Sequence, residues 1–240
     1  MIVSKTIHKK PAIPVDDPDS RFLDPSVPLS TNINHVKWTD FLSEKFNKKN
    51  LRILEIGSRE VCGKSTKRIK EFSEAEYVGM DLYEGNNVDV VGDAHKLTTL
   101  FDEPFDLIFS SSCFEHFAMP WVVAEEISKL LNPSGFVFVE THFSFGSHER
   151  PWHFFQFSDM ALRALFNKNL GFECIECGCS NPIIGKFSNL ADEYLRNKPV
   201  AGLYCHSEYF GQKIHQPDIE FDWNKVDLNS IVNNTSYPKC

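Results

Sequence analysis

The run Leu51–Ser58, with the sequence Leu-Arg-Ile-Leu-Glu-Ile-Gly-Ser, places the strongest constraint on how this chain folds. It is a mostly apolar stretch that breaks at an acidic residue and then at a glycine. A strand that ends in this way turns tightly, and a glycine has no Cβ to keep the main chain away from a ligand. The pattern therefore predicts a strand whose end faces a binding site.

Further apolar runs follow at a spacing typical of alternating strands and helices. We expect strands at Leu51–Ile56, Tyr77–Leu82, Val88–Val91, Phe105–Ser110, Phe136–Thr141, Gly171–Gly178 and Ala201–Phe210. Helices are expected at Asn34–Asn47, Gly63–Phe72, Pro120–Leu131 and Ser158–Phe166, with a turn at Asn132–Gly135. Strands of nearly continuous apolar character separated by helices predict a parallel sheet that is covered on both faces.

The length and composition indicate one substantial hydrophobic core. The chain has 240 residues, of which 42% are apolar, and this is not comfortably enough for two domains. Residues 1–33 are rich in proline and are expected to form an extended arm that closes over the site. Residues 34–215 are expected to form the domain, and residues 216–240 a polar tail.

The charge pattern disfavours nucleic acid and membrane partners. The net charge is −8 and no long run of lysine or arginine is present, so a small or neutral ligand fits better. The start of the chain lacks the pattern of a signal peptide, and no run approaches the roughly 20 apolar residues of a membrane span. The seven cysteines are expected to be reduced thiols, and reduced thiols predict a cytoplasmic protein. The sequence makes no prediction of the oligomeric state.

Two acidic residues at later strand ends suggest a nucleoside-type cofactor. Asp81 ends the second strand, where a carboxylate accepts hydrogen bonds from both ribose hydroxyls, and this feature alone fits NAD and S-adenosylmethionine equally. The dinucleotide fingerprint, however, needs glycines where this chain has Arg59 and Cys62. Asp93 and Ala94, after the third strand, would offer a carboxylate and an amide to adenine. S-adenosylmethionine is therefore favoured.

At these residues the chain resembles the class I S-adenosylmethionine-dependent methyltransferases, and in particular the small-molecule group called type 11. The motifs that carry the resemblance, in chain order, are Glu55–Ser58, Asp81, Asp93–Ala94, Phe105–Ser111 and Leu131–Gly135. The resemblance implies a doubly wound, Rossmann-like α/β sheet of seven strands in a single domain, mostly parallel with an antiparallel edge. Arg59 departs from the family, since most relatives have glycine there.

The resemblance assigns cofactor contacts to one group of residues and leaves the acceptor site to another. The residues expected at the cofactor are Glu55, Gly57, Ser58, Asp81, Leu82, Asp93, Ala94, Ser110 and Ser111. Beyond the fourth and fifth strands the chain is rich in histidine, and loops at strand ends commonly carry function. The candidates for a general base are His148, His153, His142 and His116.

Several alternatives stay open from the sequence. We assign no metal ligand, although a divalent ion held by His142, His148, Glu149 and His153 is compatible with the residue types. The favoured activity is methyl transfer to a small-molecule or sugar-like acceptor, with oxygen favoured over nitrogen. The other candidates are a regulatory module that binds S-adenosylmethionine without turnover and, less favoured, an NAD-dependent oxidoreductase.

Overall fold

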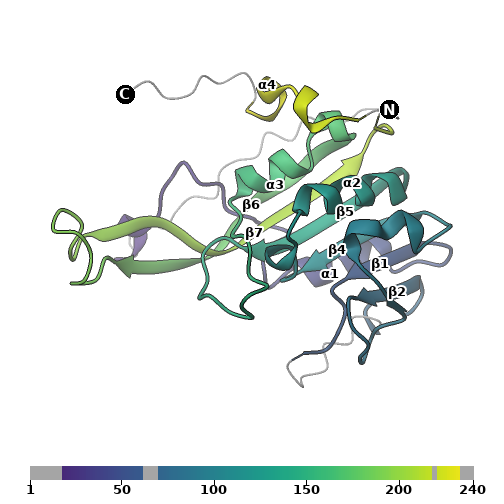
Figure 1. Ribbon diagram of the computed structural model, residues 1–240, viewed down its shortest axis with the longest axis horizontal. Coiled ribbons are helices and arrows are strands. Elements are labelled where there is room, and N and C mark those ends of the chain that lie inside the picture. The colour runs from purple at the N-terminus through teal and green to yellow at the C-terminus, as the bar shows by residue number, and fades with distance from the viewer. Residues whose placement is uncertain (1–17, 62–69, 218–220, 233–240) are drawn as a thin grey trace.

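A seven-stranded mixed sheet forms the centre of the protein, in the strand order β3-β2-β1-β4-β5-β7-β6. The strands are β1 (Arg52–Ile56), β2 (Glu76–Asp81), β3 (Val90–Val91), β4 (Phe105–Ser111), β5 (Leu131–His142), β6 (Phe172–Lys186) and β7 (Pro199–Lys213). The computed structural model describes residues 18–61, 70–217 and 221–232 (Figure 1). Strands β1 to β5 pair in parallel, whereas β7 runs antiparallel to both β5 and β6. The predicted fold class is confirmed.

The strand order reverses between β1 and β4, which sets the position of the site. Strand β1 pairs with β2 on one side and with β4 on the other, so the chain leaves β1 toward one edge and later returns to its other side. In doubly wound sheets, ligands bind beyond the carboxyl ends of the strands at this reversal. The carboxyl ends of β1, β2, β4 and β5 therefore outline the region where a ligand is expected.

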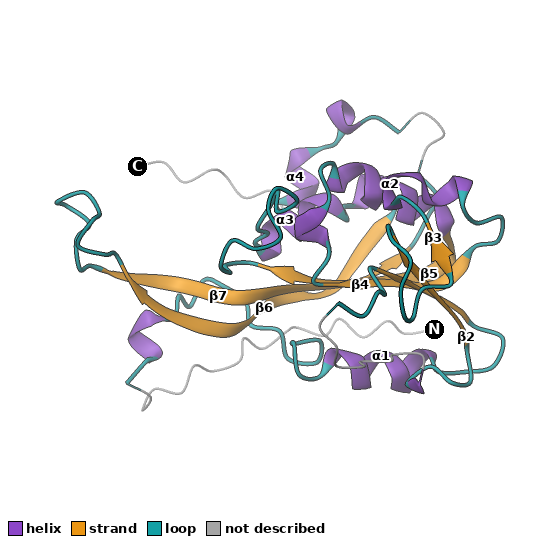
Figure 2. Cartoon of the chain, turned by 60° about the horizontal axis from the view of Figure 1, so that its bottom comes forward, coloured by secondary structure: helices purple, strands orange, loops and turns teal. Residues whose placement is uncertain are grey.

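Helices cover both faces of the sheet (Figure 2). Helix α1 (Trp38–Phe46) lies on one face, while α2 (Pro120–Leu130), α3 (Asp159–Leu165) and α4 (Leu228–Ile231) lie on the other. Adjacent residues of β1 show the division, since Ile53 packs in the α1 layer and Leu54 in the α2 layer. This alternation follows from the two-residue repeat of a strand, and it explains why the strands read as continuously apolar.

The two apolar layers are dominated by aromatic side chains. Beneath α1, the Trp38 ring stacks on Phe138 with a centroid separation of 4.9 Å. On the opposite face, Phe166 stacks on Tyr209 at 5.2 Å, and the Tyr209 hydroxyl donates to the Phe166 carbonyl. Phe221 and Trp223, from the segment expected to be a polar tail, also pack against this second layer.

The two last strands form a long hairpin that projects from the body (Figure 1). The sequence predicted strands of 171–178 and 201–210, whereas β6 and β7 each extend over 15 residues. The turn expected at Asn132–Gly135 is an irregularity inside β5, where the register with β4 shifts between Phe105 and Leu107. Most of the helix expected at Gly63–Phe72 lies outside the described residues.

The N-terminal segment runs along β6 and joins the sheet. Ser30 donates its amide to the Cys179 carbonyl, and Cys179 donates its amide to Pro28. A Cβ on Gly178 would lie 2.7 Å from the Ser30 nitrogen, so only glycine permits this approach. Residues 1–17 of the expected arm lie outside the described part of the chain.

Glu208 on β7 fastens this N-terminal segment to the hairpin. It is fully buried, and the Ser30 hydroxyl donates to its Oε2 at 2.8 Å while the Ser180 hydroxyl donates to its Oε1. Burial, together with the nearby charge of Glu140, raises the pKa of Glu208 from 4.5 to about 7 against the opposing effect of the two hydroxyls and of a main-chain hydrogen bond at His35. The folded protein therefore holds a proton here at pH values where the unfolded chain has lost it.

We expect stability to fall as the pH rises from about 4.5 to about 7, because over this range the unfolded state releases the Glu208 proton first. In Glu208→Gln the side chain stays neutral, so this part of the pH dependence disappears. The free energy of unfolding at pH 8 should then rise by on the order of 2 kcal/mol. Urea denaturation at pH 5 and at pH 8 measures both effects.

Glu176→Gln, on the neighbouring β6, serves as the matched control. Although burial opposes the shift, hydrogen bonds from Asn32 and Thr31 hold the pKa of Glu176 below its usual value. This carboxylate therefore stabilises the fold above its unfolded pKa and stops doing so as the pH falls, which is the opposite sign. Identical pH dependence in wild type and in Glu208→Gln would contradict the assignment.

Candidate functional site

The carboxyl ends of β1, β2 and β4 converge around the thiol of Cys113. This residue follows β4, and burial raises the pKa of its thiol, with further increases from the charges of Glu115, Asp81 and Glu55. These carboxylates come from β1, from β2 and from the 3-10 helix Phe114–His116 after β4, so the ends of the three strands share one region. The thiol stays protonated at neutral pH, so Cys113 contributes a neutral surface between the two halves of the site.

Gly57 forms the turn that the sequence predicted after β1. Its φ is +83°, a conformation in which side chains are strained, and a Cβ would lie 2.7 Å from the Cys113 sulfur. The amides of Gly57 and Ser58 both donate to the Met80 carbonyl, at 2.9 and 3.0 Å. These bonds tie the end of β1 to the end of β2, so the main chain at the turn occupies a fixed position.

A chain of hydrogen bonds holds the loop after β1 in place. The Ser58 hydroxyl donates to the Asn87 carbonyl at 2.7 Å, and the Asn87 side-chain amide donates to the Ser58 carbonyl at 3.0 Å. The same amide donates to the Tyr77 hydroxyl, which in turn donates to the buried carboxylate of Glu55. Ser58 and Glu55, both expected at the cofactor, therefore also maintain the local structure.

Arg59, the residue that departs from the family pattern, pairs with Asp81. The Arg59 Nε lies 3.1 Å from Asp81 Oδ1, and the guanidinium lies 5.6 Å from the centre of the Tyr83 ring. The Tyr83 amide also donates to Asp81 Oδ1, at 3.0 Å. Within the described residues, the contacts of the Asp81 carboxylate go to Oδ1, which leaves Oδ2 for a ligand.

Asp93 shows the same division between its two carboxylate oxygens. Its Oδ1 accepts from the His95 amide at 2.9 Å, at the start of the 3-10 helix Ala94–Thr99, and lies 2.6 Å from His95 Nδ1. Burial acts to raise the pKa of Asp93, but the contacts with His95 prevail and the pKa is lowered. The Met119 amide donates to His95 Nε2, so the ring proton is on Nδ1 and points to Asp93.

The remaining predicted cofactor residues occupy varied positions. The Ser110 hydroxyl is buried and donates to the Ile56 carbonyl at 2.9 Å, which joins β4 to β1. The Ser111 hydroxyl donates to Glu140 Oε1, also at 2.9 Å. Leu82 is 46% exposed, so its side chain is available as an apolar wall, whereas Ala94 is buried. Of these four, Leu82 therefore has an exposed side chain, whereas the hydroxyls of Ser110 and Ser111 are used in hydrogen bonds to neighbouring strands.

The structure brings together the four histidines that the sequence selected as base candidates. Ring centroids of His116 and His148 lie 5.0 Å apart, those of His142 and His148 lie 5.3 Å apart, and those of His148 and His153 lie 4.6 Å apart. Glu115, a fully buried residue, lies at the base of this group. Burial acts to raise its pKa, but His142 and the Thr141 hydroxyl together lower it. The cluster thus surrounds an ionised carboxylate.

Contacts with the main chain determine which ring nitrogens carry protons. His116 Nδ1 lies 2.8 Å from the Trp152 carbonyl, and His148 Nδ1 lies 3.0 Å from the Gly146 carbonyl. A carbonyl oxygen only accepts, so both Nδ1 atoms donate, and Nε2 carries the lone pair in each neutral ring. His116 Nε2 lies 4.0 Å from Glu115 Oε1 and 3.5 Å from Glu149 Oε2.

His153 has the opposite arrangement. Its Nδ1 accepts from the His148 amide at 3.3 Å, so Nε2 carries the proton of the neutral ring. Burial lowers the pKa of His153, and the nearby His148 and His116 lower it further. A neutral ring whose lone pair already accepts a hydrogen bond is poorly suited to take a proton from a ligand. Within the four candidates, the geometry therefore favours His116 and His148 over His153.

A second histidine group, which sequence reasoning missed, adjoins the first. His35 Nδ1 contacts Glu140 Oε2 at 2.8 Å, and its ring stacks on His206 at 4.1 Å. His206 lies 5.6 Å from His142 between ring centroids, so the two groups are continuous. His35 precedes α1 in a polar stretch without a motif, and only the path of the N-terminal segment along β6 brings it here.

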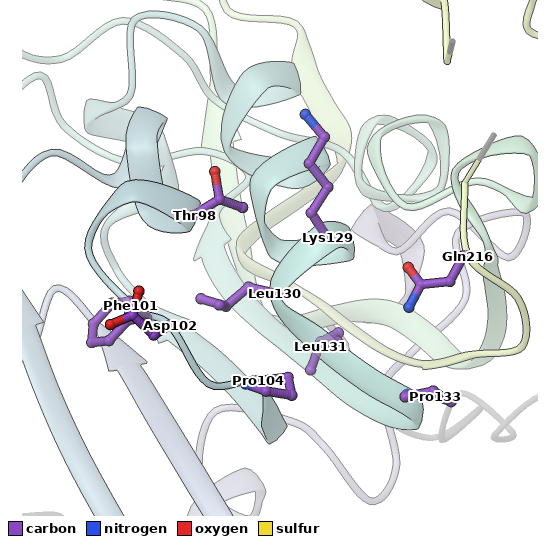
Figure 3. Close-up of a pocket in the computed structure, with 9 residues that line it drawn as sticks. All are labelled: Thr98, Phe101, Asp102, Pro104, Lys129, Leu130, Leu131, Pro133 and Gln216. Carbon is purple, nitrogen blue, oxygen red and sulfur yellow. The ribbon is translucent and has the colours of Figure 1, made fainter. Parts of the chain in front are cut away.

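A shallow hollow elsewhere on the protein does not coincide with this site (Figure 3). It has a volume of about 290 Å³ and lies at the opposite end of the sheet, between the end of α2 and the starts of β4 and β5. Its lining includes Phe101, Leu130 and Pro133 together with the charged side chains of Asp102 and Lys129. Ligands of doubly wound sheets bind at the other end, so we do not assign the activity to this hollow.

Comparisons with known proteins agree with the architecture of the fold. Residues 33–176 match a family model described as a methyltransferase domain, while no curated protein matches the chain. One similar solved structure is an S-adenosylmethionine-dependent methyltransferase from Archaeoglobus fulgidus. It has 18% identity and a TM-score of 0.51, and the match covers 73% of this chain and 93% of that one.

Two further structures with bound ligands are similar at the level of the fold. The 1,6-didemethyltoxoflavin-N1-methyltransferase of Burkholderia thailandensis, with S-adenosylhomocysteine bound, has 15% identity and a TM-score of 0.51, with 74% and 76% of the two chains covered. The plantazolicin methyltransferase, in complex with a triazolic substrate analogue and SAH, has 16% identity and a TM-score of 0.52, with 77% and 86% covered. At sequence identities this low, the structural similarity shows a common fold and nothing more specific.

We expect Gly57→Ala to destabilise the protein by about 1–3 kcal/mol, because the new Cβ meets the Cys113 side chain and the residue must keep a positive φ. Thermal and urea denaturation measure the loss. Gly146→Ala is the matched control, since a Cβ there meets nothing within 4 Å and its φ is not positive. Equal stability of both variants would show that the turn relaxes without cost.

Proposed function

Because the chain belongs to the methyltransferase-domain family, we propose that it transfers the methyl group of S-adenosylmethionine to a hydroxyl of a small, sugar-like molecule. One observation favours oxygen as the acceptor atom. The Trp152 carbonyl fixes the Nδ1 proton of His116, so the Nε2 lone pair is presented beyond the end of β4. A hydroxyl must lose its proton during methyl transfer, and a neutral imidazole is well suited to accept it.

The residues at the strand ends fit the proposed cofactor. Asp81 and Asp93 end adjacent strands, and each uses Oδ1 for local structure while Oδ2 is left for a ribose hydroxyl or an adenine amino group. The fixed turn at Gly57 offers main chain without a Cβ. The neutral thiol of Cys113 lies beside that turn, and a sulfonium benefits from the negative charge of the surrounding carboxylates.

The chemical role of the protein is to align two reactants and to move one proton. S-adenosylmethionine supplies a methyl carbon on a positively charged sulfur, which leaves as the neutral thioether when the C–S bond breaks. His116 Nε2 accepts the proton of the acceptor hydroxyl, whose oxygen forms the new bond to the methyl carbon. Glu149, 3.5 Å from Nε2, and Glu115 stabilise the resulting imidazolium.

His148 and His142 are proposed to line the acceptor side of the same space. His148 also directs a lone pair from Nε2, and its ring packs edge to face on both His116 and His142. Two exposed aromatic residues of the same loop, Phe145 and Trp152, provide apolar surface next to these polar groups. A mixed surface of this kind suits a sugar-like molecule, which presents both hydroxyls and C–H faces.

Two rival functions are less well supported. A module that binds the cofactor without turnover does not require several histidines with main-chain-fixed tautomers at the acceptor end. An NAD-dependent oxidoreductase requires glycines at positions where this chain has other residues, among them Arg59, which pairs with Asp81.

In the described part of the chain, no helix is long and apolar enough to cross a bilayer. We retain a cytoplasmic location and a small-molecule partner as proposals.

We expect Asp81→Ala to abolish measurable binding of S-adenosylmethionine, because the ribose hydroxyls lose the carboxylate that accepts from them. Isothermal titration of S-adenosylmethionine and of NAD into wild type and variant tests this. Asp102→Ala, an exposed residue in the hollow at the other end of the sheet, is the matched control and should bind as wild type does. Binding of NAD in place of S-adenosylmethionine would overturn the proposed function.

His116→Ala should lower turnover by about 100-fold or more while it leaves cofactor affinity unchanged, because the acceptor loses its base. Formation of S-adenosylhomocysteine with a panel of sugar and phenol hydroxyl compounds measures the rate. Added imidazole should restore part of the activity, an effect that a purely structural role would not produce. His215→Ala, an exposed histidine outside the site, is the control, and equal rates in both variants would exclude His116 as the base.

A further inference from the structure

Two buried polar atoms at the acceptor end of the site face each other without forming a hydrogen bond. Glu115 Oε1 and His142 Nδ1 lie 2.6 Å apart, with side-chain exposures of 0% and 8%. Their orientation nevertheless fails the geometry of a hydrogen bond, and within the described residues neither atom has a hydrogen-bond partner, although His116 Nε2 also lies 4.0 Å from Glu115 Oε1. A buried polar atom without a partner costs about 1–3 kcal/mol, and more when it is charged. The pair therefore indicates a missing third group.

A third potential ligand is close to both atoms. Glu115, His142 and His148 each bring one nitrogen or oxygen atom into a space in which the three atoms all lie within 4.8 Å of one another. Two histidines with one carboxylate form a recurrent ligand set for zinc and other divalent transition ions. The set combines a full negative charge with two neutral nitrogen donors, which is the combination that such an ion requires.

The surrounding contacts orient these side chains as ligands. The second carboxylate oxygen of Glu115 accepts from the Thr141 hydroxyl at 2.7 Å, so Oε1 points to the cluster. The Gly146 carbonyl accepts from His148 Nδ1, which leaves the Nε2 lone pair for a ligand bond. Metal-binding histidines commonly donate their other ring nitrogen to a carbonyl in this way. The His142 ring is held by stacking on Phe145 at 4.4 Å.

The neighbouring group of His35, Glu140 and His206 has similar composition but different contacts. Its ligand atoms also lie within 4.8 Å of one another. Here, however, His35 Nδ1 contacts Glu140 with hydrogen-bond geometry, and the Asn181 side-chain amide contacts His206 Nδ1 at 3.1 Å. A metal ion at this second group would displace existing hydrogen bonds, whereas at the first it would satisfy atoms that lack them.

We propose that Glu115, His142 and His148 bind one divalent transition-metal ion, with zinc as the best chemical match. His116 is not part of this ligand set, and its Nε2 lies beside it, 4.0 Å from Glu115 Oε1. The ion would thus be adjacent to the base proposed above and on the acceptor side of the site. Metal binding is a property of these three side chains, so this proposal does not depend on the proposed methyl-transfer function.

The test is metal binding by the full-length protein, prepared without a histidine tag. Wild type is treated with a chelator, incubated in turn with Zn²⁺, Mn²⁺ and Co²⁺, dialysed, and analysed for metal content by mass spectrometry. We expect one Zn²⁺ per chain and a rise in melting temperature with added Zn²⁺, since a ligand of the native state stabilises it. Titration calorimetry then gives the affinity of wild type and of variants.

Glu115→Gln and His148→Asn should each weaken Zn²⁺ binding by at least about tenfold, because one ligand is lost. His148 is in a partly exposed loop, so its variant is expected to fold even if the change at the buried Glu115 does not. His215→Asn is the matched histidine control and should bind as wild type does. The absence of bound metal in wild type, or unchanged affinity in both ligand variants, would overturn the proposal.

Cofactor titration in the same samples separates this proposal from the proposed function. Absence of zinc from wild type, together with intact binding of S-adenosylmethionine and intact turnover, would overturn the metal site alone. Stoichiometric zinc with no binding of S-adenosylmethionine would overturn the methyl-transfer proposal and leave the metal site standing. Zinc that binds equally well to His148→Asn and to wild type would show that the ion occupies different residues.

Discussion

The part of this protein where the histidines gather depends on the burial of carboxylates in and beside the strands. Four glutamates, Glu55, Glu115, Glu140 and Glu208, are at most 1% exposed. A buried carboxylate must be paired, hydrogen-bonded or protonated, since an uncompensated charge is costly in a medium of low dielectric. The residues that contact them include Tyr77, Thr141, His142, His35, Ser111, Ser30 and Ser180. Because these partners are distant in sequence, compensating the carboxylates also fixes the loops and the N-terminal segment.

The buried carboxylates are compensated in different ways, and the differences follow from their neighbours. Glu140 and Glu208 are directly opposite each other on β5 and β7, so like charges there would repel. Glu140 contacts an imidazole, whereas Glu208 accepts from the hydroxyls of Ser30 and Ser180 and from the main chain at His35, and burial raises the pKa of Glu208. Glu115 keeps its charge beside His142.

The sequence predicted the sheet well because its strands are covered on both faces and read as apolar runs. The turn at Gly57 and the acids Asp81 and Asp93 were also predictable, since each follows directly from the end of such a run. The long-range pairing of strands was not predictable from the sequence. Asn181 and Pro182 resemble a turn, but β6 continues past them because β7 pairs with β6 there. His35 joins the site only through the path of the N-terminal segment, and histidine tautomers depend on carbonyls that no motif encodes.

Arg59 illustrates how a departure from a family pattern can be compatible with the same site. Its ion pair with Asp81 is partly exposed, with side-chain exposures of 31% and 15%, and such pairs contribute about 0–1 kcal/mol. A hydrogen bond from a ribose hydroxyl to a carboxylate contributes about 1.5–3 kcal/mol. A ligand that makes two such bonds therefore gains more than the ion pair loses, even if the pair must break completely. In the structure, Arg59 and the Tyr83 amide both contact Asp81 Oδ1 and so orient the carboxylate, and under the proposed function this orientation would prepare the acid for the ribose without blocking it.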